Sequence, residues 1–463
     1  MSKVVNFQRK YDAASQTSRT SNWITQSTDA NAAIIRPDLI RNRARDLVRN
    51  NAWANKAVSV ITNNTIGYGI RPQFISGAKK RAQTLWMQWA ETTQCDANGL
   101  TDIYGIQQQI MRCMVESGEC LVRLRTRKAE DNLAIPMQLQ VLEPDFLYEH
   151  NDSSLPNGGY INRGIEYDAI GRRVAYYLYK THPGISGYAR YSNDYSRVPA
   201  NEIIHCFRQD RPGQERGVSW LAPVMITLRE LDIFEDAFLN RQKLANLFAA
   251  FMYANDVEVA AEELTLNEEI TPGSIHVLPE NRRMEFSTPP PASDYGPYTL
   301  ANLKRVASGL GITYESLTGD LSDVNFSSAR MGWQEFGRNV DSWRWQLFIP
   351  RVCHRIMDWF VLFSGLNVTT DWTPPARVMV DPIRELPPII DAVRAGLMSL
   401  SEALREQGYN PESVLTEIAQ DNALLDKLGL VLDTDPRKTS GQGQAQTQIE
   451  TGTTNDNNQP ANS

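Results

Sequence analysis

The segment that most restricts how this 463-residue chain can fold runs from Tyr298 to Phe363. It starts with a short helical pattern, continues through a polar stretch at residues 318–328, and ends in a long helical pattern rich in Trp and Phe. Because the polar stretch has Gly, Asp, Ser and Asn where the helical period should continue, it predicts a loop between two helices. Bends in the long helix are expected at Gly332, Gly337 and Pro350.

A second pair of helical patterns flanks an acidic insertion. After Pro223 a helix is predicted to about Phe251, and its apolar side consists of Leu228, Leu231, Phe234 and Phe238. Residues 254–281 contain seven Asp or Glu and no Lys or Arg, so an acidic surface lobe is expected between the two helices. Six of the seven acidic residues are Asp256, Glu258, Glu262, Glu263, Glu268 and Glu269.

Residues 32–220 are predicted to form an α+β domain in which helices are followed by antiparallel strands. Asp38 is expected to cap the first helix, with Leu39, Ala44, Leu47 and Val48 on one side. The other side carries four arginines, Arg41, Arg43, Arg45 and Arg49. These arginines have two interpretations, a solvated helix face or a contact with DNA phosphates or with an acidic neighbouring subunit.

Later segments give further local signals. Gly118 is expected to end a helix that turns into the strand CLVRLRTR, and residues 165–180 to form a hairpin that turns at 169–171. Two or three helices are expected within residues 385–430, where Ser399 and Glu402 form a capping box. The polar compositions of residues 1–30 and of the tail from Lys438 predict disorder.

Composition argues against several classes of protein. The net charge of −7 and the pI of about 5.5 give no overall positive field that would attract nucleic acid. The five cysteines form no CxxC pair, which argues against a zinc site or a disulfide framework and favours a reducing cytoplasm. Without an apolar signal core or a run of about eighteen apolar residues, neither secretion nor membrane spanning is predicted.

The sequence has no recognisable catalytic motif. It lacks a GxxxxGK[ST] phosphate loop, an HExxH pair, a GxSxG elbow and a dinucleotide fingerprint, so we predict no enzymatic activity, no cofactor and no metal. The alternative from another class is a carboxylate-dependent hydrolase or nuclease, because clustered acids can bind Mg²⁺. Its candidate acids are Glu315, Asp320, Asp323 and Glu335.

Three segments together resemble the portal proteins of tailed bacteriophages, most closely the lambda-type family. They are residues 298–363, the stretch RARDLVRNNAWANKAVSVITNNTIGYGI, and the segment GVSWLAPVMITLRELDIFEDAFLNRQKLAN with its G-x-S-x-x-x-P start. The resemblance implies a mainly helical portal fold of the α+β class. It assigns an arm to residues 1–31, a wing to 32–222 and 329–384, stem helices to 223–252 and 294–311, a clip to 253–293, a tunnel loop to 312–328, a helical crown to 385–436 and a disordered tail to 437–463.

The same resemblance implies a ring, usually of twelve subunits, at one capsid vertex. Double-stranded DNA would be packaged through it by the terminase large subunit and later ejected, and the acidic clip residues would meet this motor and then a head-tail adaptor. Other implied partners are the major capsid and scaffold proteins, with assembly in the host cytoplasm and no membrane. A non-channel capsid scaffold or adaptor is a further alternative.

The resemblance also gives the polar loop a role, because a DNA duplex that slides through a ring must not be held tightly by many arginines. A loop of small polar and acidic residues offers weak hydrogen bonding and mild repulsion instead. The candidate DNA-facing residues are Asp320, Ser322, Asp323, Asn325, Ser327 and Arg330.

Overall fold

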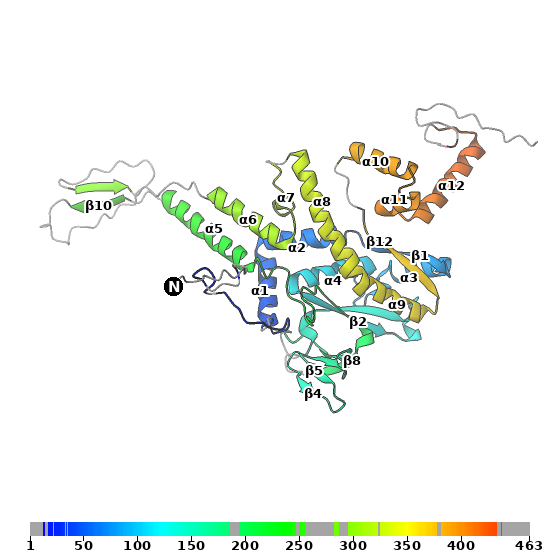
Figure 1. The fold of residues 1–463 in the computed structure, drawn as a ribbon, viewed down its shortest axis with the longest axis horizontal. Coiled ribbons are helices and arrows are strands. Elements are labelled where there is room, and N and C mark those ends of the chain that lie inside the picture. Colours follow the sequence, from blue (N-terminus) through cyan, green and yellow to red (C-terminus); the bar gives the residue numbers. More distant parts are fainter. Residues whose placement is uncertain are drawn as a thin grey trace, which may run out of the picture. The chain divides into compact units, whose positions relative to one another are not determined.

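The computed structural model describes residue 13 and residues 17–21, 23–32, 34, 36–185, 194–246, 250–254, 282–286, 295–322, 325–376, 381–432 and 437. The chain divides into two compact units. The first consists of Met1–Gly69 and Gly77–Val368, and the second of Ile70–Ser76 and Thr369–Ser463. Most of the helices and strands in Figure 1 therefore belong to the first unit.

Four helices open the first unit, α1 (Pro37–Asn50), α2 (Ala52–Thr65), α3 (Lys79–Trp89) and α4 (Ile103–Ser117). Pro37 is suited to the first position of α1 because it lacks the N–H that would otherwise need a partner there. The prediction that Asp38 caps this helix is therefore wrong, since Asp38 lies in the first turn. The start of α2 is capped, because Asn51 Oδ1 accepts a hydrogen bond from the Ala54 amide at 2.8 Å.

The predicted two-sided pattern of α1 is confirmed only in part. Ala44, Leu47 and Val48 are buried as expected, but Leu39 is exposed and Arg41 is only 5% exposed. Arg41 turns inward because its guanidinium meets carboxylates of Asp145 and Glu149, which lie about one hundred residues further along the chain. Helical periodicity cannot reveal such a partner, because it reports only which residues share a face.

The strands of the first unit form antiparallel sheets. One sheet has the order β3-β2-β9, and its strands are β2 (Glu119–Thr126), β3 (Met137–Leu142) and β9 (Ile203–Phe207). A second sheet contains β4 (Ser153–Ser154), β5 (Tyr160–Asn162), β6 (Ile165–Tyr167), β7 (Arg173–Tyr179) and β8 (Tyr195–Pro199) in that order. The predicted hairpin is the β6–β7 pair, and Gly171 with φ +79° lies in its turn.

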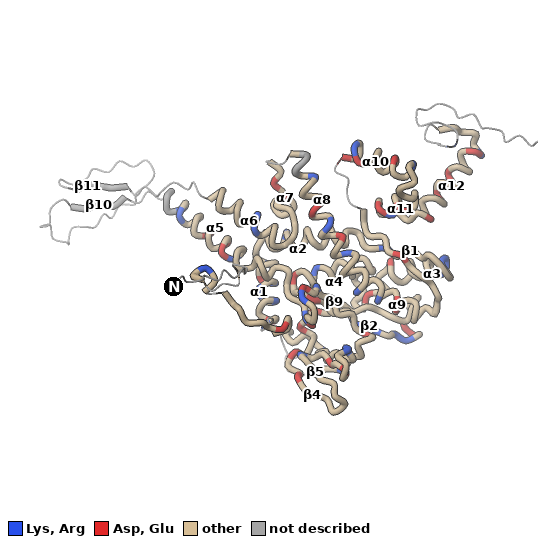
Figure 2. Tube along the Cα trace, viewed as in Figure 1, with Lys and Arg blue, Asp and Glu red and all other residues tan. Residues whose placement is uncertain are grey.

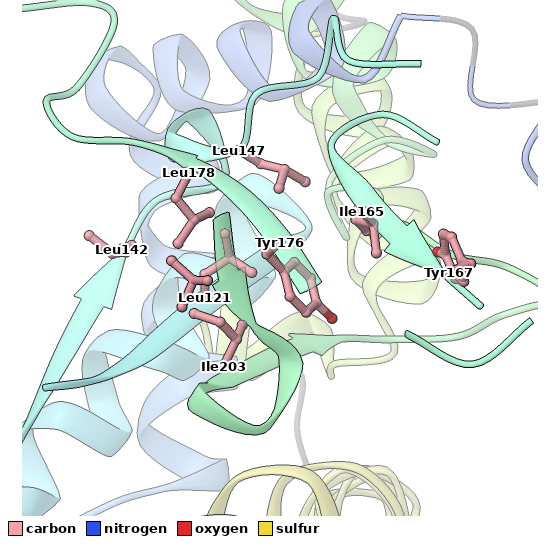
Figure 3. Packing of buried hydrophobic residues seen from close by; sticks show 9 residues of the cluster. Leu121, Leu142, Leu147, Ile165, Tyr167, Tyr176, Leu178 and Ile203 are labelled. Atoms are coloured by element: carbon pink, nitrogen blue, oxygen red, sulfur yellow. The ribbon is translucent and has the colours of Figure 1, made fainter. Parts of the chain in front are cut away.

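The two sheets share a hydrophobic core (Figure 3). Leu121 from β2 and Ile203 from β9 lie beside Leu178 and Tyr176 from β7, and all four are buried. The part of the first unit before α5 is called the body below. Among its described residues, short 3₁₀ helices connect the elements at Thr93–Cys95, Ala129–Asp131, Pro144–Phe146 and Ala200–Glu202. The predicted order of helices followed by antiparallel strands is therefore confirmed for this region.

Gly118 ends α4 and starts β2, as predicted. Its φ of +95° is a conformation that residues with a side chain rarely adopt. A Cβ at this position would also lie 2.5 Å from the carbonyl carbon of Val218. The glycine thus lets the end of α4 approach the segment around residues 217–219.

Two helices and a two-stranded ribbon follow. α5 (Met225–Asn246) and α6 (Tyr295–Leu310) lie side by side, and β10 (Ala250–Ala254) pairs antiparallel with β11 (Arg282–Phe286) (Figure 1). The prediction that the first helix continues to about Phe251 is wrong, because Phe251 pairs with Glu285 in the ribbon. A strand partner more than thirty residues away makes the ladder possible, and local helical spacing does not show it.

A long helical run follows the short helix α7 (Tyr314–Thr318). It consists of α8 (Phe326–Ser342), a π-helical segment (Trp343–Cys353) and α9 (His354–Ser364). Pro350, where a bend was predicted, lies inside the π-helical segment, which fits a residue that has no N–H to donate within an α-helix. Arg344 fixes the run to the end of α2, because its guanidinium donates to the carbonyl oxygens of Thr65 and Asn64 at 2.7 Å each.

The second unit contains three helices after the ribbon of β1 (Arg71–Gly77) and β12 (Val368–Thr373). They are α10 (Pro382–Arg394), α11 (Leu400–Glu406) and α12 (Pro411–Leu428). One half of the predicted capping box of α11 is confirmed, because Ser399 Oγ accepts from the Glu402 amide at 3.0 Å. Pro387 and Pro388 lie inside α10.

Candidate functional site

The α5–α6 helix pair is held together by aromatic rings. Phe234 lies 4.4 Å from Tyr298 and Phe238 lies 4.6 Å from Tyr295, both measured between ring centroids. Nearer the body, Leu228 and Leu231 of α5 are almost fully buried. The four residues predicted to form the apolar side of this helix therefore lie in two environments, two in the core and two half-buried against α6.

The polar segment between α7 and α8 is shorter than predicted, because α8 begins at Phe326. Asp320 organises its first part, where its Oδ1 accepts from the Ser322 amide at 3.1 Å and from Ser322 Oγ at 2.6 Å. The hydrogen bond from the Ser322 side chain is the main reason why the pKa of Asp320 is lowered. The exposed carboxylate thus stays charged at neutral pH and closes a local turn.

The other predicted loop residues are only partly placed. Asn325 is exposed, and its carbonyl accepts from the Ala329 amide in the first turn of α8. Arg330 is exposed one turn further on, and Ser327 belongs to α8. Asp323 lies outside the described residues. So do all six acidic candidates of the insertion, Asp256, Glu258, Glu262, Glu263, Glu268 and Glu269.

A buried charge cluster, which the sequence pattern did not reveal, lies inside the body. Glu119 at the start of β2 is 2% exposed and pairs with the guanidinium of Arg216 through the two nitrogens Nε and Nη2. It also accepts from the Gly217 amide at 2.8 Å and from His205 Nε2 at 2.9 Å. Although burial opposes the charged carboxylate, Arg216 and His205 hold the pKa of Glu119 well below its usual value.

The cluster fixes the protonation state of its histidine. Arg173 Nη1 lies 3.2 Å from His205 Nδ1, so Nδ1 accepts this hydrogen bond while Nε2–H donates to Glu119. Burial, together with the positive charges of Arg173 and Arg216, outweighs the effect of Glu119 and lowers the pKa of His205 to about 4. His205 is therefore neutral at pH 7.

The same cluster extends to α1. Arg216 Nη2 donates to Glu149 at 2.7 Å, and Arg41 Nη1 donates to the same carboxylate oxygen at 3.4 Å. Arg45 continues the chain of ion pairs with Asp145 at 2.7 Å. Arg41 and Arg45 are thus neutralised within the subunit, which contradicts both the solvated-face and the DNA-contact interpretations for these two residues. Arg43 and Arg49 are exposed.

The first unit also holds part of the predicted N-terminal arm. The Asn31 side chain donates to the Gly213 carbonyl at 3.0 Å and accepts from the Glu215 amide at 2.8 Å. Arg211 donates to the carbonyl of Thr28 at 3.0 Å. Residues 28–31 are therefore attached to the segment that carries Arg216, although their polar composition predicted a flexible arm.

The acidic residues proposed for metal-dependent hydrolysis do not converge within the described ranges. The group there with metal-like spacing is Glu143, Asp145 and His182, not Glu315, Asp320 or Glu335. Arg45 already pairs with Asp145 and Glu143, so a cationic side chain fills the position that an ion would need. Among the described helices none is long and apolar enough to cross a membrane.

Comparison with known proteins agrees with this architecture. The family model described as phage portal protein, lambda family, matches residues 16–344, which include α1 to α8. A probable portal protein of Halomonas phage phiHAP-1 is 25% identical over 91% of this chain and 88% of its own length. Portal protein B of Escherichia phage lambda is 19% identical over 85% of each chain.

A chain in the virion of a native gene transfer agent is also similar in structure. It has a TM-score of 0.49 and 14% identity, and the match covers 80% of this chain and 94% of that one. The sequence comparisons place the protein among the portal or connector components of a capsid. The chain belongs to the lambda family of phage portal proteins.

Proposed function

We propose that this portal protein assembles into a closed ring of twelve identical subunits at one capsid vertex. Double-stranded DNA passes through the ring during packaging and ejection, and the ring is assembled in the host cytoplasm. The observation that carries the proposal is the family match across residues 16–344, which spans the body, the α5–α6 pair and the start of the long helix. We assign no enzymatic activity to the chain, so the energy for packaging comes from the terminase large subunit.

The ring is tested by negative-stain electron microscopy together with native mass spectrometry of the purified full-length protein. We expect rings of twelve subunits with an axial hole on the order of 20 Å or more. A protein that stays monomeric under all assembly conditions contradicts the proposal. Rings without a hole wide enough for a duplex support the alternative of a capsid scaffold or adaptor that does not conduct DNA.

The domain assignments extend this proposal. The α5–α6 pair forms the stem, residues 253–293 form the clip, the 319–325 segment faces the DNA path, and residues 385–436 form the crown. The stem assignment is supported by the aromatic contacts between the two helices, which pack side by side in antiparallel directions. The loop assignment is supported by the exposure of Asp320, Ser322 and Arg330.

The loop proposal predicts that added positive charge slows DNA movement, because lysines bind phosphates and this binding is salt-dependent. The combined variant Asp320→Lys with Ser322→Lys should form normal rings but package DNA more slowly at low salt than at high salt. Glu130→Lys, at an exposed position in a 3₁₀ helix of the body, is the control. Equal packaging rates in all three proteins would show that the segment does not approach DNA.

The clip proposal is that the acidic residues between β10 and β11 bind the terminase large subunit during packaging and the head-tail adaptor afterwards. It is supported by the seven acids without a base in residues 254–281. Charge reversal of Glu262, Glu263, Glu268 and Glu269 to lysine should leave rings intact and weaken their capture of purified terminase. Unchanged capture would remove these residues from the interface.

A further inference from the structure

The helices of the second unit leave large apolar residues in contact with solvent. On α10, Ile383, Leu386, Ile390 and Val393 follow one another at intervals of three, four and three, so they form one stripe along the helix. Ile383 is 85% exposed and Ile390 is 47% exposed, and no residue of α10 is buried. An amphipathic helix of this kind is stable when its stripe is covered by another element.

α12 has a second uncovered apolar side. Val414, Leu415, Ile418, Leu424, Leu425 and Leu428 lie on one half of the helix surface. Ile418 is 47% exposed and Leu428 is 60% exposed, and Pro411 is the one buried residue of α12. α11 lies between the two helices in sequence and contacts both of them. Ile383 and Ile390 of α10 and Ile418 and Leu428 of α12 nevertheless remain exposed within the unit.

α10 carries both basic and acidic residues, whereas α12 carries mainly acidic ones (Figure 2). Asp421 lies in the middle of the apolar side of α12, between Ile418 and Leu425 along the helix, and is exposed. Any element that covers this side buries a carboxylate, which is costly unless a cation comes with it. Arg394 lies beside the apolar stripe of α10, next to Val393. Within the described residues neither Arg394 nor Asp421 has an ion-pair partner.

We propose that the apolar stripe of α10 in one subunit packs against the apolar side of α12 in the next subunit, with Arg394 paired to Asp421 across the contact. Two different complementary surfaces on one chain produce a head-to-tail contact, and a contact of that kind closes into a ring when its rotation is right. The inference rests on the proposed ring and adds to it the surface that joins neighbouring crowns.

Disulfide formation between introduced cysteines tests the contact directly. Chains that carry Ile390→Cys together with Leu415→Cys, Ile418→Cys or Leu425→Cys are assembled and oxidised, then run on a denaturing gel without reductant. At least one pair should give a ladder of covalent oligomers up to the full ring. The native cysteines interfere little, because four are buried and the fifth, Cys113, is half-buried, and oxidised wild type measures their background.

The controls separate the possible outcomes. Ile390→Cys with Thr416→Cys or Gln420→Cys, on the opposite side of α12, should give no ladder. A covalent dimer from Ile390→Cys alone, above the background of oxidised wild type, would mean that two α10 helices meet each other, which overturns the proposal. Crosslinking confined to single chains would also overturn it, because α10 would then lie on α12 of the same subunit. The absence of a crosslink in all three pairs would also overturn the proposal.

Charge reversal gives a second measurement. Arg394→Glu and Asp421→Arg should each reduce the fraction of protein in rings, and a chain that carries both changes should recover it. Arg81→Glu, at an exposed position of α3, is the control for altered net charge. If wild type forms rings and both single variants form them equally well, this inference fails while the proposed function stands. If wild type forms no rings, the proposed function fails first.

Discussion

Helices α4 and α12 are similar in length but differ in what they bury. α4 has 15 residues and buries nine of them, whereas α12 has 18 residues and buries one. Both carry apolar residues at helical spacing, although α4 is the more amphipathic of the two, and they differ further in what covers them. α4 is covered by neighbours from its own unit, including α1, α2 and β2, and α12 meets α11. The body is thus stabilised within one subunit, while the apolar side of α12 needs a further partner.

The largest expected effect on stability comes from breaking the buried charge cluster inside the body. Glu119→Ala leaves Arg216 buried without its main carboxylate partner, so the free energy of unfolding should fall by about 3–5 kcal/mol. Urea denaturation monitored by circular dichroism measures it. Glu116→Ala is the matched control, because Glu116 lies three residues away on α4 and burial raises its pKa, so its removal should cost little. Equal losses in both variants would contradict the role of the cluster.

The difference between α4 and α12 itself can be measured by truncating one apolar residue in each. Ile110→Ala removes a fully buried side chain from α4 and should lower the free energy of unfolding by about 2–5 kcal/mol. Leu415→Ala removes a side chain that is 40% exposed, and in the monomer it should change stability by less than about 0.5 kcal/mol. In assembled rings the Leu415→Ala effect should grow. A large effect in the monomer would mean that α12 is covered within its own chain.

The body should also lose stability in mild acid. The pKa of His205 is about 4 in the folded protein, below its ordinary value of 6.5, so the unfolded state binds the extra proton. The contribution of neutral His205 to stability is complete above pH 6.5 and is lost as the pH falls from 6.5 to about 4. The lowered pKa of Glu119 also makes the protein less stable as the pH falls. The total for His205 is about 3–4 kcal/mol.

Unfolding free energies measured between pH 7 and pH 4 test this prediction. His205→Gln keeps a donor toward Glu119 and an acceptor toward Arg173 but cannot take up a proton, so its stability should fall less over the same range. The second unit carries no such buried histidine among its described residues, and local melting of α10–α12 should therefore not follow this titration. Identical pH profiles for wild type and His205→Gln would contradict the assignment.

The smallest expected effect concerns a helix cap in the second unit. Ser399→Ala removes the side-chain acceptor for the Glu402 amide and should destabilise α11 by about 1 kcal/mol. Faster hydrogen exchange at the amides of the first turn of α11 measures it. Ser401→Ala, inside the same helix, serves as the control because its side chain does not cap the start. No change at Glu402 would show that the cap contributes nothing.

Much of the fold could be predicted because it depends on local rules. The period of apolar residues predicted α1 and the long helical run that ends with α9, and the glycines at 118 and 171 located the end of α4 and the turn of the β6–β7 hairpin. Errors arose where a distant partner decided the outcome. The helix expected to reach Phe251 stops because residues 282–286 supply a strand, and Arg41 is buried because residues 145–149 supply carboxylates.

The features of the candidate site also fall into those that could be predicted from the sequence and those that could not. Sequence alone identified the α5 residues that pack, the acidic insertion and the polar segment after α7, because composition and spacing are visible in one stretch of chain. The cluster of Glu119, His205 and Arg216 could not be found in this manner, since its members are separated by about ten to one hundred residues. In VESGECLVRL the one available signal was a glutamate directly before the apolar residues that begin a strand.

The sequence by itself determined the class of the protein, the order of its helices and strands, and its family, because these follow from periodicity, composition and the order of similar segments. Only the tertiary structure decided which charges are buried and which apolar sides remain uncovered. The physical reason is that a side chain's free energy depends on the atoms packed against it. Those atoms come from residues whose distance along the chain says nothing about their distance in space.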